Sequence, residues 1–514
     1  CRRCFRQRRV VLRRGQFFRE TPGPAAAGPD GPPEEEARQP EPDCCCFTVW
    51  PSDHPERCAR PQWAEARENP SIRLCADCDR LAGEFGAPRT DRCAIARSLQ
   101  WHVGHYRRVK EACDQPTEAE KERAIDEVVE IVSASTGRVE FSRETQRQMF
   151  DRALEDLNMT SSVGKCQMDR FGATIGVALG YDPVRGCDSE RVDFLYHLVS
   201  ARLDALRAGQ QEADPINLFI KQEPHKQTKL EQQRYRLISA VSLVDTMVDR
   251  MLFGHIKQDV WSESPVLVGW TPRQGGFHWL WEKLRGAQRL EIDKKAWDWS
   301  MQPWVVEASL RVLEQLSLHA TEEWLSLARQ RFEVLFRFAR FDGQGLVFDQ
   351  AEPGIMKSGC FLTIFVNSIS QLLLHFVAVR RANLQKVIEA PYCMGDDTIQ
   401  RCWASSEQVQ QYVFELNRAG CLVGDCALLG KEEPFTFCGF AIEEDKIHPA
   451  YRAKHCYVLK HLDPTVAVET LDSYQQDYVF EPHVFGHVVD GLLEIRANAL
   501  RSKGKMRRFL RGDE

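Results

Sequence analysis

A Gly-Asp-Asp triplet between two apolar stretches places the strongest constraint on how this chain can fold. Gly395, Asp396 and Asp397 separate "VIEAPYCM" from "TIQRCW". Both flanking stretches are typical of strands and a glycine allows a tight turn, so we expect a β-hairpin with Asp396 at its tip. Adjacent carboxylates repel each other and resist burial, which leaves two interpretations: a solvated turn or a site that holds a cation.

A second acidic stretch lies upstream of the triplet. In "LEIDKKAWDWS", Asp293 ends a short apolar run and Asp298 follows five residues later. If residues 290–293 form a strand, Asp293 occupies its exposed end and can approach the hairpin tip. Converging carboxylates are what two Mg²⁺ ions require when they hold an attacking hydroxyl and a phosphoryl group. The alternative is a pair of capped, solvated turn aspartates.

A hydroxyl and an amide share one face of a predicted helix in "KSGCFLTIFVNSISQLLLH". The helix is expected to begin at Ser358 and Gly359, and Thr363 and Asn367 lie four residues apart on a face that is otherwise apolar. Such a pair can be a satisfied core contact. Together with Asp298, it can also hydrogen-bond a ribose 2′-hydroxyl and so select ribonucleotides.

A cationic stretch, "IKQEPHKQTKLEQQRYRLI", contains five basic side chains within residues 221–236. They are Lys221, Lys226, Lys229, Arg234 and Arg236. A solvated charged hairpin is the usual explanation of such a run. Beside a metal site it becomes a clamp for a triphosphate, with Glu223 orienting a cation and not contacting substrate.

Composition restricts the class of protein. Of 514 residues, 43% are hydrophobic and 28% charged, as in globular proteins, which excludes a disordered or fibrous chain. The net charge of -6 argues against a generic polyanion binder, but clustered basic residues leave room for a local nucleic-acid site. The most apolar long stretch, residues 361–379, is interrupted by polar side chains, so we expect a buried amphipathic helix and no transmembrane segment.

The first 115 residues differ in composition from the rest. Residues 1–19 carry eight arginines and a Pro/Gly/Glu tract follows, so residues 1–43 are predicted to be a basic arm and a disordered linker. Residues 44–115 are rich in cysteine. No secretory signal precedes them, which favours reduced thiols, and a start at Cys1 indicates a piece of a longer translation product.

A zinc knuckle is one interpretation of the cysteine-rich segment, because Cys75 and Cys78 have CxxC spacing. The other candidate ligands nearby are Cys58, Cys93, His102 and His105. The second half of a four-ligand pattern is missing and the "CCC" at residues 44–46 is poor ligand geometry, so structurally incidental cysteines are favoured.

Beyond residue 116 the pattern becomes helical, and Thr117 with Glu120 has the spacing of a capping box. Strand-like runs alternate with long helices without the regular spacing of βαβ units. The predicted class is therefore α+β, with helices dominant.

The four motifs occur in one order, and in that order the chain resembles a viral RNA-directed RNA polymerase. "TSSVG" at residues 160–164 is similar to the loop at which template RNA enters, and "FTFCGF" at residues 435–440 to the hairpin between palm and thumb. The resemblance covers residues 160–440. "RLISAVSLVDTMVDRMLFG", "MGDDTIQ" and "FCGF" are most similar to the sobemovirus-like polymerases of the solemovirus group.

The resemblance implies a right-hand fold in which helical fingers and thumb enclose a small antiparallel palm sheet. Residues 116–285 would be the fingers, with the nucleotide clamp at 221–236. Residues 286–440 would be the palm, with motifs at 293–298, 358–367, 394–397 and 435–440, and residues 441–514 a small helical thumb.

The resemblance also implies roles for individual residues. Asp293 and Asp396 would be the principal ligands of two Mg²⁺ or Mn²⁺ ions, with Asp397 a weaker or outer ligand. The ribose would be read by Asp298, Thr363 and Asn367, the flexible loop beside the nascent base pair would contain Ser358 and Gly359, and the triphosphate would meet Lys221 and Arg236 with Arg234 close by. The family's usual lysine after Gly-Asp-Asp is absent from its place, so Lys431 is the expected general acid.

The implied function is replication and transcription of a positive-strand RNA genome. The partners would be template and nascent RNA, ribonucleotides, a viral protein primer and other viral replication proteins, in a replication complex in the host-cell cytoplasm. Two alternatives stay open: a reverse transcriptase, against which Asp298 and Asn367 argue, and a non-catalytic RNA-binding or scaffold protein.

Overall fold

The structure is a computed structural model, and it describes residues 10–11, 47–51 and 67–513. Nearly all of the predicted arm and linker, Cys58 and the "CCC" run lie outside the described residues. The chain is a mixture of helices and strands, which confirms the predicted α+β class. The helices are α1 (Ala76–Ala82), α2 (Arg92–Ala112), α3 (Glu118–Ile131), α4 (Gln146–Glu155), α5 (Ile175–Ala178), α6 (Ser189–Arg207), α7 (Gln227–Glu231), α8 (Leu243–Phe253), α9 (Gly276–Lys283), α10 (Trp297–Ser300), α11 (Pro303–Gln315), α12 (Glu322–Phe336), α13 (Thr363–Arg381), α14 (Ser406–Arg418), α15 (Arg452–Lys460), α16 (Ala467–Asp477), α17 (Pro482–Arg496) and α18 (Lys503–Arg511).

A five-stranded antiparallel sheet carries the two acidic motifs. Its strands, in spatial order, are β1 (Val10–Val11), β14 (Val423–Leu429), β8 (Gln288–Lys294), β13 (Asp397–Cys402) and β12 (Tyr392–Met394). The central strand β8 is therefore flanked by β13 and β14, which come more than a hundred residues later in the chain. This pairing brings sequence-distant motifs to one sheet.

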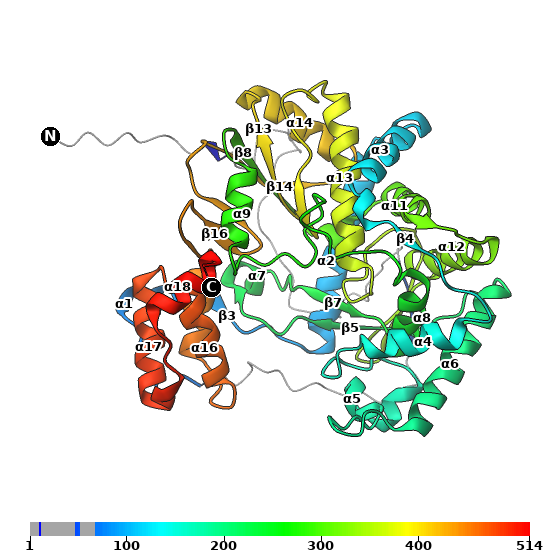
Figure 1. Ribbon diagram of the computed structural model, residues 1–514, viewed down its shortest axis with the longest axis horizontal. Helices are drawn as coiled ribbons and strands as arrows, with labels where there is room; N and C mark the ends of the chain where they lie inside the picture. The colour runs from blue at the N-terminus through cyan, green and yellow to red at the C-terminus, as the bar shows by residue number, and fades with distance from the viewer. Residues whose placement is uncertain (1–9, 12–46, 52–66, 514) are drawn as a thin grey trace, which may run out of the picture.

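Both faces of this sheet are covered, as Figure 1 shows for α13 on one side and α9 on the other. Ile292 belongs to the main hydrophobic core with α13, whereas Ile399 packs into a second core with α9. In that second core, the guanidinium of Arg289 lies 3.8 Å from the ring centroid of Trp281. Alternate side chains thus enter opposite cores, as expected for a strand buried on both faces.

A second, mixed sheet supports the cationic stretch. Its order is β2 (Phe47–Pro51), β11 (Leu346–Gln350), β10 (Arg340–Gly343), β5 (Ile216–Ile220) and β7 (Leu237–Ala240), with β10 and β5 parallel and the other pairs antiparallel. β5 and β7 flank residues 221–236. Two short pairs join β3 (Phe85–Gly86) to β6 (His225–Lys226) and β4 (Gly137–Arg138) to β9 (Ser317–Leu318).

The C-terminal part begins with a three-stranded meander and continues as helices α15 to α18. The strands are β15 (Phe435–Phe437), β16 (Phe440–Ile442) and β17 (Ile447–Pro449). Helices α15 to α17 share a third hydrophobic core with the segment around α1, to which Ile72, Tyr457 and Val488 contribute, whereas the buried side chains of α18 belong to the second core. Figure 1 shows α1 beside α16 and α17, although some 380 residues separate them.

Two local predictions are confirmed. Thr117 accepts a hydrogen bond from the Glu120 amide and the Glu120 carboxylate accepts one from the Thr117 amide, so α3 begins with a capping box. Among the described residues, α13 alone is long and apolar enough to cross a membrane, and 78% of its most apolar stretch is buried inside the protein. It is the buried helix that the sequence predicts.

Candidate active site

The Gly-Asp-Asp triplet forms the predicted hairpin. Met394 pairs with Asp397, so Gly395 and Asp396 are the two turn residues. Gly395 has φ +67°, a left-handed conformation that favours glycine, and its amide donates a hydrogen bond of 2.9 Å to the Ser368 hydroxyl on α13. The turn is therefore fixed to the core helix, while the side chains of Asp396 and Asp397 are exposed.

Asp293 lies at the same edge of the sheet as the hairpin tip. It is the penultimate residue of β8, and its neighbour Ile292 pairs with Thr398 on β13. Although the Asp293 side chain reaches solvent, the protein atoms around it remove part of its hydration and raise its pKa, and the negative charge of Asp396 raises it further. The structure thus brings together the carboxylates predicted as metal ligands.

A buried lysine beneath the hairpin was missed by sequence reasoning. Lys294 donates a hydrogen bond of 3.0 Å to the carbonyl of Asp396 and another to the Thr398 hydroxyl. Burial lowers the pKa of Lys294. The Asp397 side chain reaches solvent, but the protein atoms around it remove part of its hydration and raise its pKa to about 6, with a further rise from Asp396. Strand alternation could have identified Lys294, because the residue after an exposed Asp293 must face the opposite, buried side.

Two of the three residues predicted to read the ribose are in contact. The amide of Asn367 donates a hydrogen bond of 2.9 Å to Asp298, and its carbonyl oxygen accepts one of 2.9 Å from the indole of Trp297. Burial raises the pKa of Asp298 to about 6, Asp396 adds to the rise, and the Asn367 hydrogen bond opposes it. The indole fixes the orientation of the Asn367 amide, which in turn holds the Asp298 carboxylate close to Asp396.

The other members of that motif have different contacts. The Thr363 hydroxyl donates to the carbonyls of Lys357 and Cys360, both at 2.8 Å, at the start of α13. The Thr363 hydroxyl thus bonds to backbone carbonyls that precede α13 and does not pair with Asn367. Ser358 accepts a hydrogen bond of 3.0 Å from the Ser239 amide, an edge contact with the second sheet.

Gly359 lies against the same strand. Its amide donates to the Ser239 carbonyl at 3.0 Å, and a Cβ added to Gly359 would come within 2.7 Å of that oxygen. Glycine at this position is explained by the close approach of two backbones.

The cationic stretch forms a cluster around Glu223. This carboxylate lies 3.3 Å from Lys221, 3.3 Å from Arg236 and 2.7 Å from Lys454, a residue of α15. Burial would raise the pKa of Glu223, but the Lys454 hydrogen bond and the surrounding cations lower it to about 2. Glu223 therefore orients cations, as predicted, and sequence reasoning missed Lys454 because it lies over 200 residues away.

Some side chains of the cationic stretch lie near the carboxylates and others do not. The charge of Arg236 opposes the rise in pKa of Asp298 and Asp397, and that of Lys229 does so for Asp293. Arg234 instead lies over the ring of Trp101, with 4.6 Å between guanidinium and ring centroid. The predicted clamp residues thus divide into two environments.

Lys431 is not near the carboxylates, which corrects its predicted role as general acid. On β14, Val423 pairs with Lys294, whereas Leu429 pairs with Arg289 at the opposite end of β8. Arg289 and Asp293 are four residues apart on β8, a distance of about 13 Å along a strand. Lys431 lies beyond Leu429, so it is farther than this from Asp293. The prediction relied on position in the sequence and not on strand direction.

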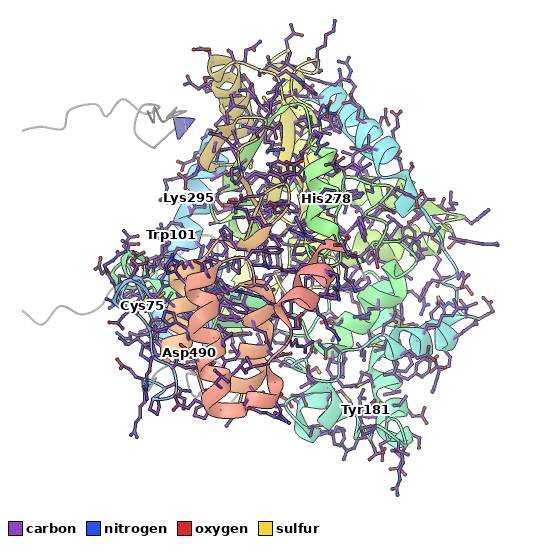
Figure 2. The ribbon with its side chains drawn as sticks, turned by 60° about the vertical axis from the view of Figure 1, so that its left-hand side comes forward. Cys75, Trp101, Tyr181, His278, Lys295 and Asp490 are labelled. Atoms are coloured by element: carbon purple, nitrogen blue, oxygen red, sulfur yellow. The ribbon has the colours of Figure 1, made fainter. Side chains whose placement is uncertain are left out.

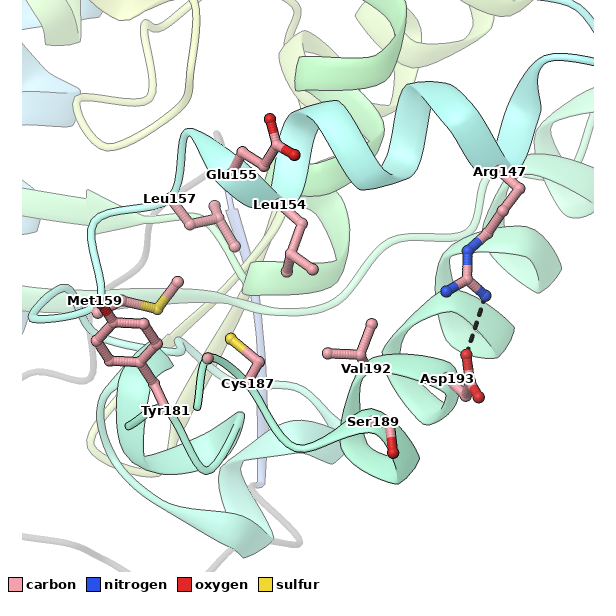
Figure 3. A pocket seen from close by; sticks show the side chains of 11 residues that line it. Arg147, Leu154, Glu155, Leu157, Met159, Tyr181, Cys187, Ser189, Val192 and Asp193 are labelled. Carbon is pink, nitrogen blue, oxygen red and sulfur yellow. Dashed lines mark hydrogen bonds and ion pairs between the residues drawn. The ribbon is translucent and has the colours of Figure 1, made fainter. Parts of the chain in front are cut away.

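A surface cavity of about 640 Å³ lies apart from these residues, between α4 and the loop before α6 (Figure 3). Leu154, Met159, Tyr181 and Val192 contribute to its lining, and Arg147 bonds to Asp193 at its rim at 2.9 Å. Its elements lie at the opposite end of the molecule from β8 and β13 in Figure 1. It is not part of the carboxylate site.

Residues 79–449 match the family of proteins described as viral RNA-dependent RNA polymerase. The match covers more than half of the 514 residues and includes the acidic motifs, Asn367 and the cationic stretch, but not Lys454. The chain belongs to this family. Membership in the polymerase family agrees with the order of the motifs and with the meeting of Asp293 and Asp396.

Relatives of this polymerase-family chain come from plant viruses. It is 32% identical over 280 residues, 51% of its length, to replicase polyprotein P2AB of Southern bean mosaic virus. It is 34% identical over 197 residues, 36% of its length, to the P2AB of Cocksfoot mottle virus, and 25% identical over 350 residues, 61% of its length, to protein P1-P2 of Potato leafroll virus. The matches cover 27%, 20% and 32% of these relatives, so the chain spans about a third of their length or less.

Proposed function

We propose that this chain catalyses template-directed synthesis of RNA from ribonucleoside triphosphates, in replication and transcription of a positive-strand RNA genome. The observation that carries the proposal is the meeting of Asp293 with Asp396 and Asp397 at one sheet edge, beside the bonded pair Asp298 and Asn367. The partners would be template and nascent RNA, ribonucleotides, a viral protein primer and other viral replication proteins. The place of action would be a replication complex in the host-cell cytoplasm.

The proposed division of the fold follows the same logic. Residues 286–440 would be the palm, because they contain the antiparallel sheet with both acidic motifs. Residues 116–285 would be the fingers, with the cationic cluster facing the palm. Residues 441–514, which are mostly helical, would be the thumb.

The carboxylates would hold two divalent ions, Mg²⁺ or Mn²⁺. Carboxylate oxygens are the ligands that these ions prefer, and exposed side chains at a fixed turn allow them to enter. When bound by Asp293 and Asp396, with Asp397 as a weaker ligand, such ions lower the pKa of the RNA 3′-hydroxyl and stabilise charge on the leaving pyrophosphate. Lys294 would hold the hairpin in position through the Asp396 carbonyl, while Lys221 and Arg236 would contact the triphosphate.

A change of Asn367 is expected to weaken selection of ribonucleotides over deoxyribonucleotides. Asn367→Ala removes the donor that positions Asp298, so the NTP to dNTP incorporation ratio on a primed RNA template should fall about 10- to 100-fold, the value of one or two charge-assisted hydrogen bonds. Ser370→Ala, on the same helix and also buried, is the matched control and should leave the ratio unchanged.

The wild-type ratio in the same assay tests the function itself. Templated incorporation of NTPs supports the proposal, and a preference for dNTPs would identify a reverse transcriptase. If Asn367→Ala incorporates nucleotides more slowly but keeps the wild-type NTP to dNTP ratio, Asp298 and Asn367 do not read the ribose.

Binding of Mg²⁺ is expected to depend on pH between 5 and 7. The pKa of Asp397 is raised to about 6, so the metal-free site holds a proton below that pH and releases it above. An ion must displace the proton, and one such group weakens Mg²⁺ affinity about tenfold from pH 7 to pH 5. Calorimetric titrations at pH 5, 6 and 7 measure this. An affinity that is equal at all three would contradict the assignment, and Asp397→Asn should reduce the dependence.

A non-catalytic RNA-binding protein would behave differently in these experiments. It would bind RNA equally well with and without the aspartates and would incorporate no nucleotide under any condition. The cysteine-rich and arginine-rich first 115 residues are where such a role would reside.

A further inference from the structure

Three potential zinc ligands meet where the N-terminal segment packs against the C-terminal helices. The side chains of Cys75, Cys78 and His487 place their ligand atoms all within 4.8 Å of one another. Cys75 is the residue before α1 and Cys78 lies in its first turn, whereas His487 lies on α17, some 410 residues later. Figure 2 shows Cys75 beside the C-terminal helices, close to Asp490 of α17.

A fourth thiol lies beside the group, next to Cys78 but not within 4.8 Å of all three of the other ligand atoms. Cys456, on α15, is buried, and its thiol lies within hydrogen-bond range of the Cys78 thiol. The four side chains therefore come from three separate segments of the chain. Three sulfurs and one imidazole nitrogen are the ligand types of a structural zinc site, and Cys456 would move closer to Cys75 and His487 to complete the tetrahedron.

We propose that Cys75, Cys78, Cys456 and His487 bind one structural zinc ion that fixes the N-terminal segment to the C-terminal helices. Soft thiolates select zinc over the hard Mg²⁺ expected at the carboxylates. The site differs from the zinc knuckle considered from sequence, because two of its ligands lie beyond residue 450.

The other zinc ligands considered from the sequence lie away from this cluster. His102 contacts the carbonyl of Tyr235 at 3.0 Å and His105 that of Lys295 at 2.9 Å, each through its Nε2. Cys93 is exposed on α2. These side chains belong to the packing of α2 and not to the cysteine cluster.

Hydrogen bonds around the cluster identify the lone pair of His487 and the neighbouring charge. The backbone amide of Cys75 donates to Nε2 of His487 at 3.3 Å, so this nitrogen carries the imidazole lone pair, and a metal bound there would replace this hydrogen bond. Three thiolates and Zn²⁺ carry a net charge of -1, and the guanidinium of Arg452 lies 3.6 Å from the Cys78 sulfur, where it offsets that charge.

The location explains what a metal would contribute. The C-terminal core is small, and small cores are often stabilised by a metal or a cross-link. Asn69 already bonds to the Leu462 carbonyl at 2.8 Å across the same interface. A zinc ion would hold this interface closed without a large apolar area.

Metal content and optical spectra test the proposal without reference to polymerase activity. The full chain, purified without chelators, is expected to contain zinc in elemental analysis, and Co²⁺ in its place should give thiolate charge-transfer bands and the visible bands of tetrahedral cobalt. His487→Ala and Cys75→Ser alter side chains that are not fully buried, and each should lose about one zinc per chain relative to wild type. Cys93→Ser is the matched control and should keep the wild-type content.

Thermal unfolding with and without a chelator distinguishes loss of zinc from failure of a variant to fold. Chelation should lower the unfolding temperature of the wild type and of Cys93→Ser, but should not shift that of Cys75→Ser. The proposal is overturned if the folded wild type lacks zinc, if a Cys75–Cys78 disulfide is found in its place, or if His487→Ala and Cys75→Ser keep the full metal content.

Discussion

Asp293→Asn is expected to reduce templated RNA synthesis about 1,000-fold while leaving the protein folded. The carboxylate at the end of β8 lies near Asp396 at the sheet edge, and a neutral amide of the same shape removes one charge from the proposed metal site with little change in packing. Loss of one such ligand removes several kcal/mol of transition-state stabilisation. Single-turnover extension of a labelled RNA primer measures the effect.

The control for this prediction is a matched substitution on the surface. Asp445→Asn changes an exposed aspartate in the turn between β16 and β17, and it should retain the wild-type rate. Extension by Asp293→Asn within tenfold of the wild type, with an intact circular dichroism spectrum, would remove Asp293 from the metal site.

The largest expected effect on stability comes from a buried ion cluster between α8 and α12. Arg331 on α12 bonds to Asp249 on α8 at 2.6 and 3.1 Å and lies 3.3 Å from Asp245, and all three side chains are at most 2% exposed. Asp249→Ala leaves the arginine buried with its main partner removed. We expect a loss of about 3–5 kcal/mol in the free energy of unfolding.

Urea denaturation compares this variant with one that breaks an ion pair nearer the surface. Glu314→Ala removes the partner of Arg329, whose side chain is 57% exposed, and should cost under about 1 kcal/mol. Equal losses in the two variants would show that Arg331 regains its hydrogen bonds elsewhere and that the buried cluster contributes no more than a surface ion pair.

Local patterns in the sequence predict the acidic edge of the sheet well. The hairpin at Gly395 and the strand end at Asp293 depend on residues that are neighbours in the chain, so alternation and turn chemistry are sufficient to predict them. The sequence predicts that Asp298, Thr363 and Asn367 serve one ribose hydroxyl, but it does not predict the direct hydrogen bond between Asp298 and Asn367, which joins residues 69 apart in the chain. The strand arms are shorter than predicted, since β12 begins only at Tyr392.

Contacts between distant segments could not be predicted in the same way. Lys454 reaches Glu223 and His487 reaches Cys75 through the packing of the C-terminal helices, which no local pattern encodes. Lys431 was misplaced for a related reason: its distance from Asp293 depends on the antiparallel register of β14 with β8.

The packing of the N-terminal segment connects the two ends of the described chain. Residues around α1 share a core with α15 to α17, and Lys454 of α15 bonds to the cationic cluster. The C-terminal helices are thus joined both to the cysteine-rich segment and to the proposed nucleotide clamp. Loss of zinc from the proposed site would therefore shift α15 and weaken the ion pair between Lys454 and Glu223.

The measurement that tests the central claim most directly is incorporation of labelled ribonucleotides on a primed RNA template with Mg²⁺, by the wild-type chain and by Asp396→Asn. The account predicts template-dependent incorporation by the wild type and loss of at least about 1,000-fold in the variant. Equal activity of the two chains would contradict the assignment of the carboxylate edge as the catalytic centre.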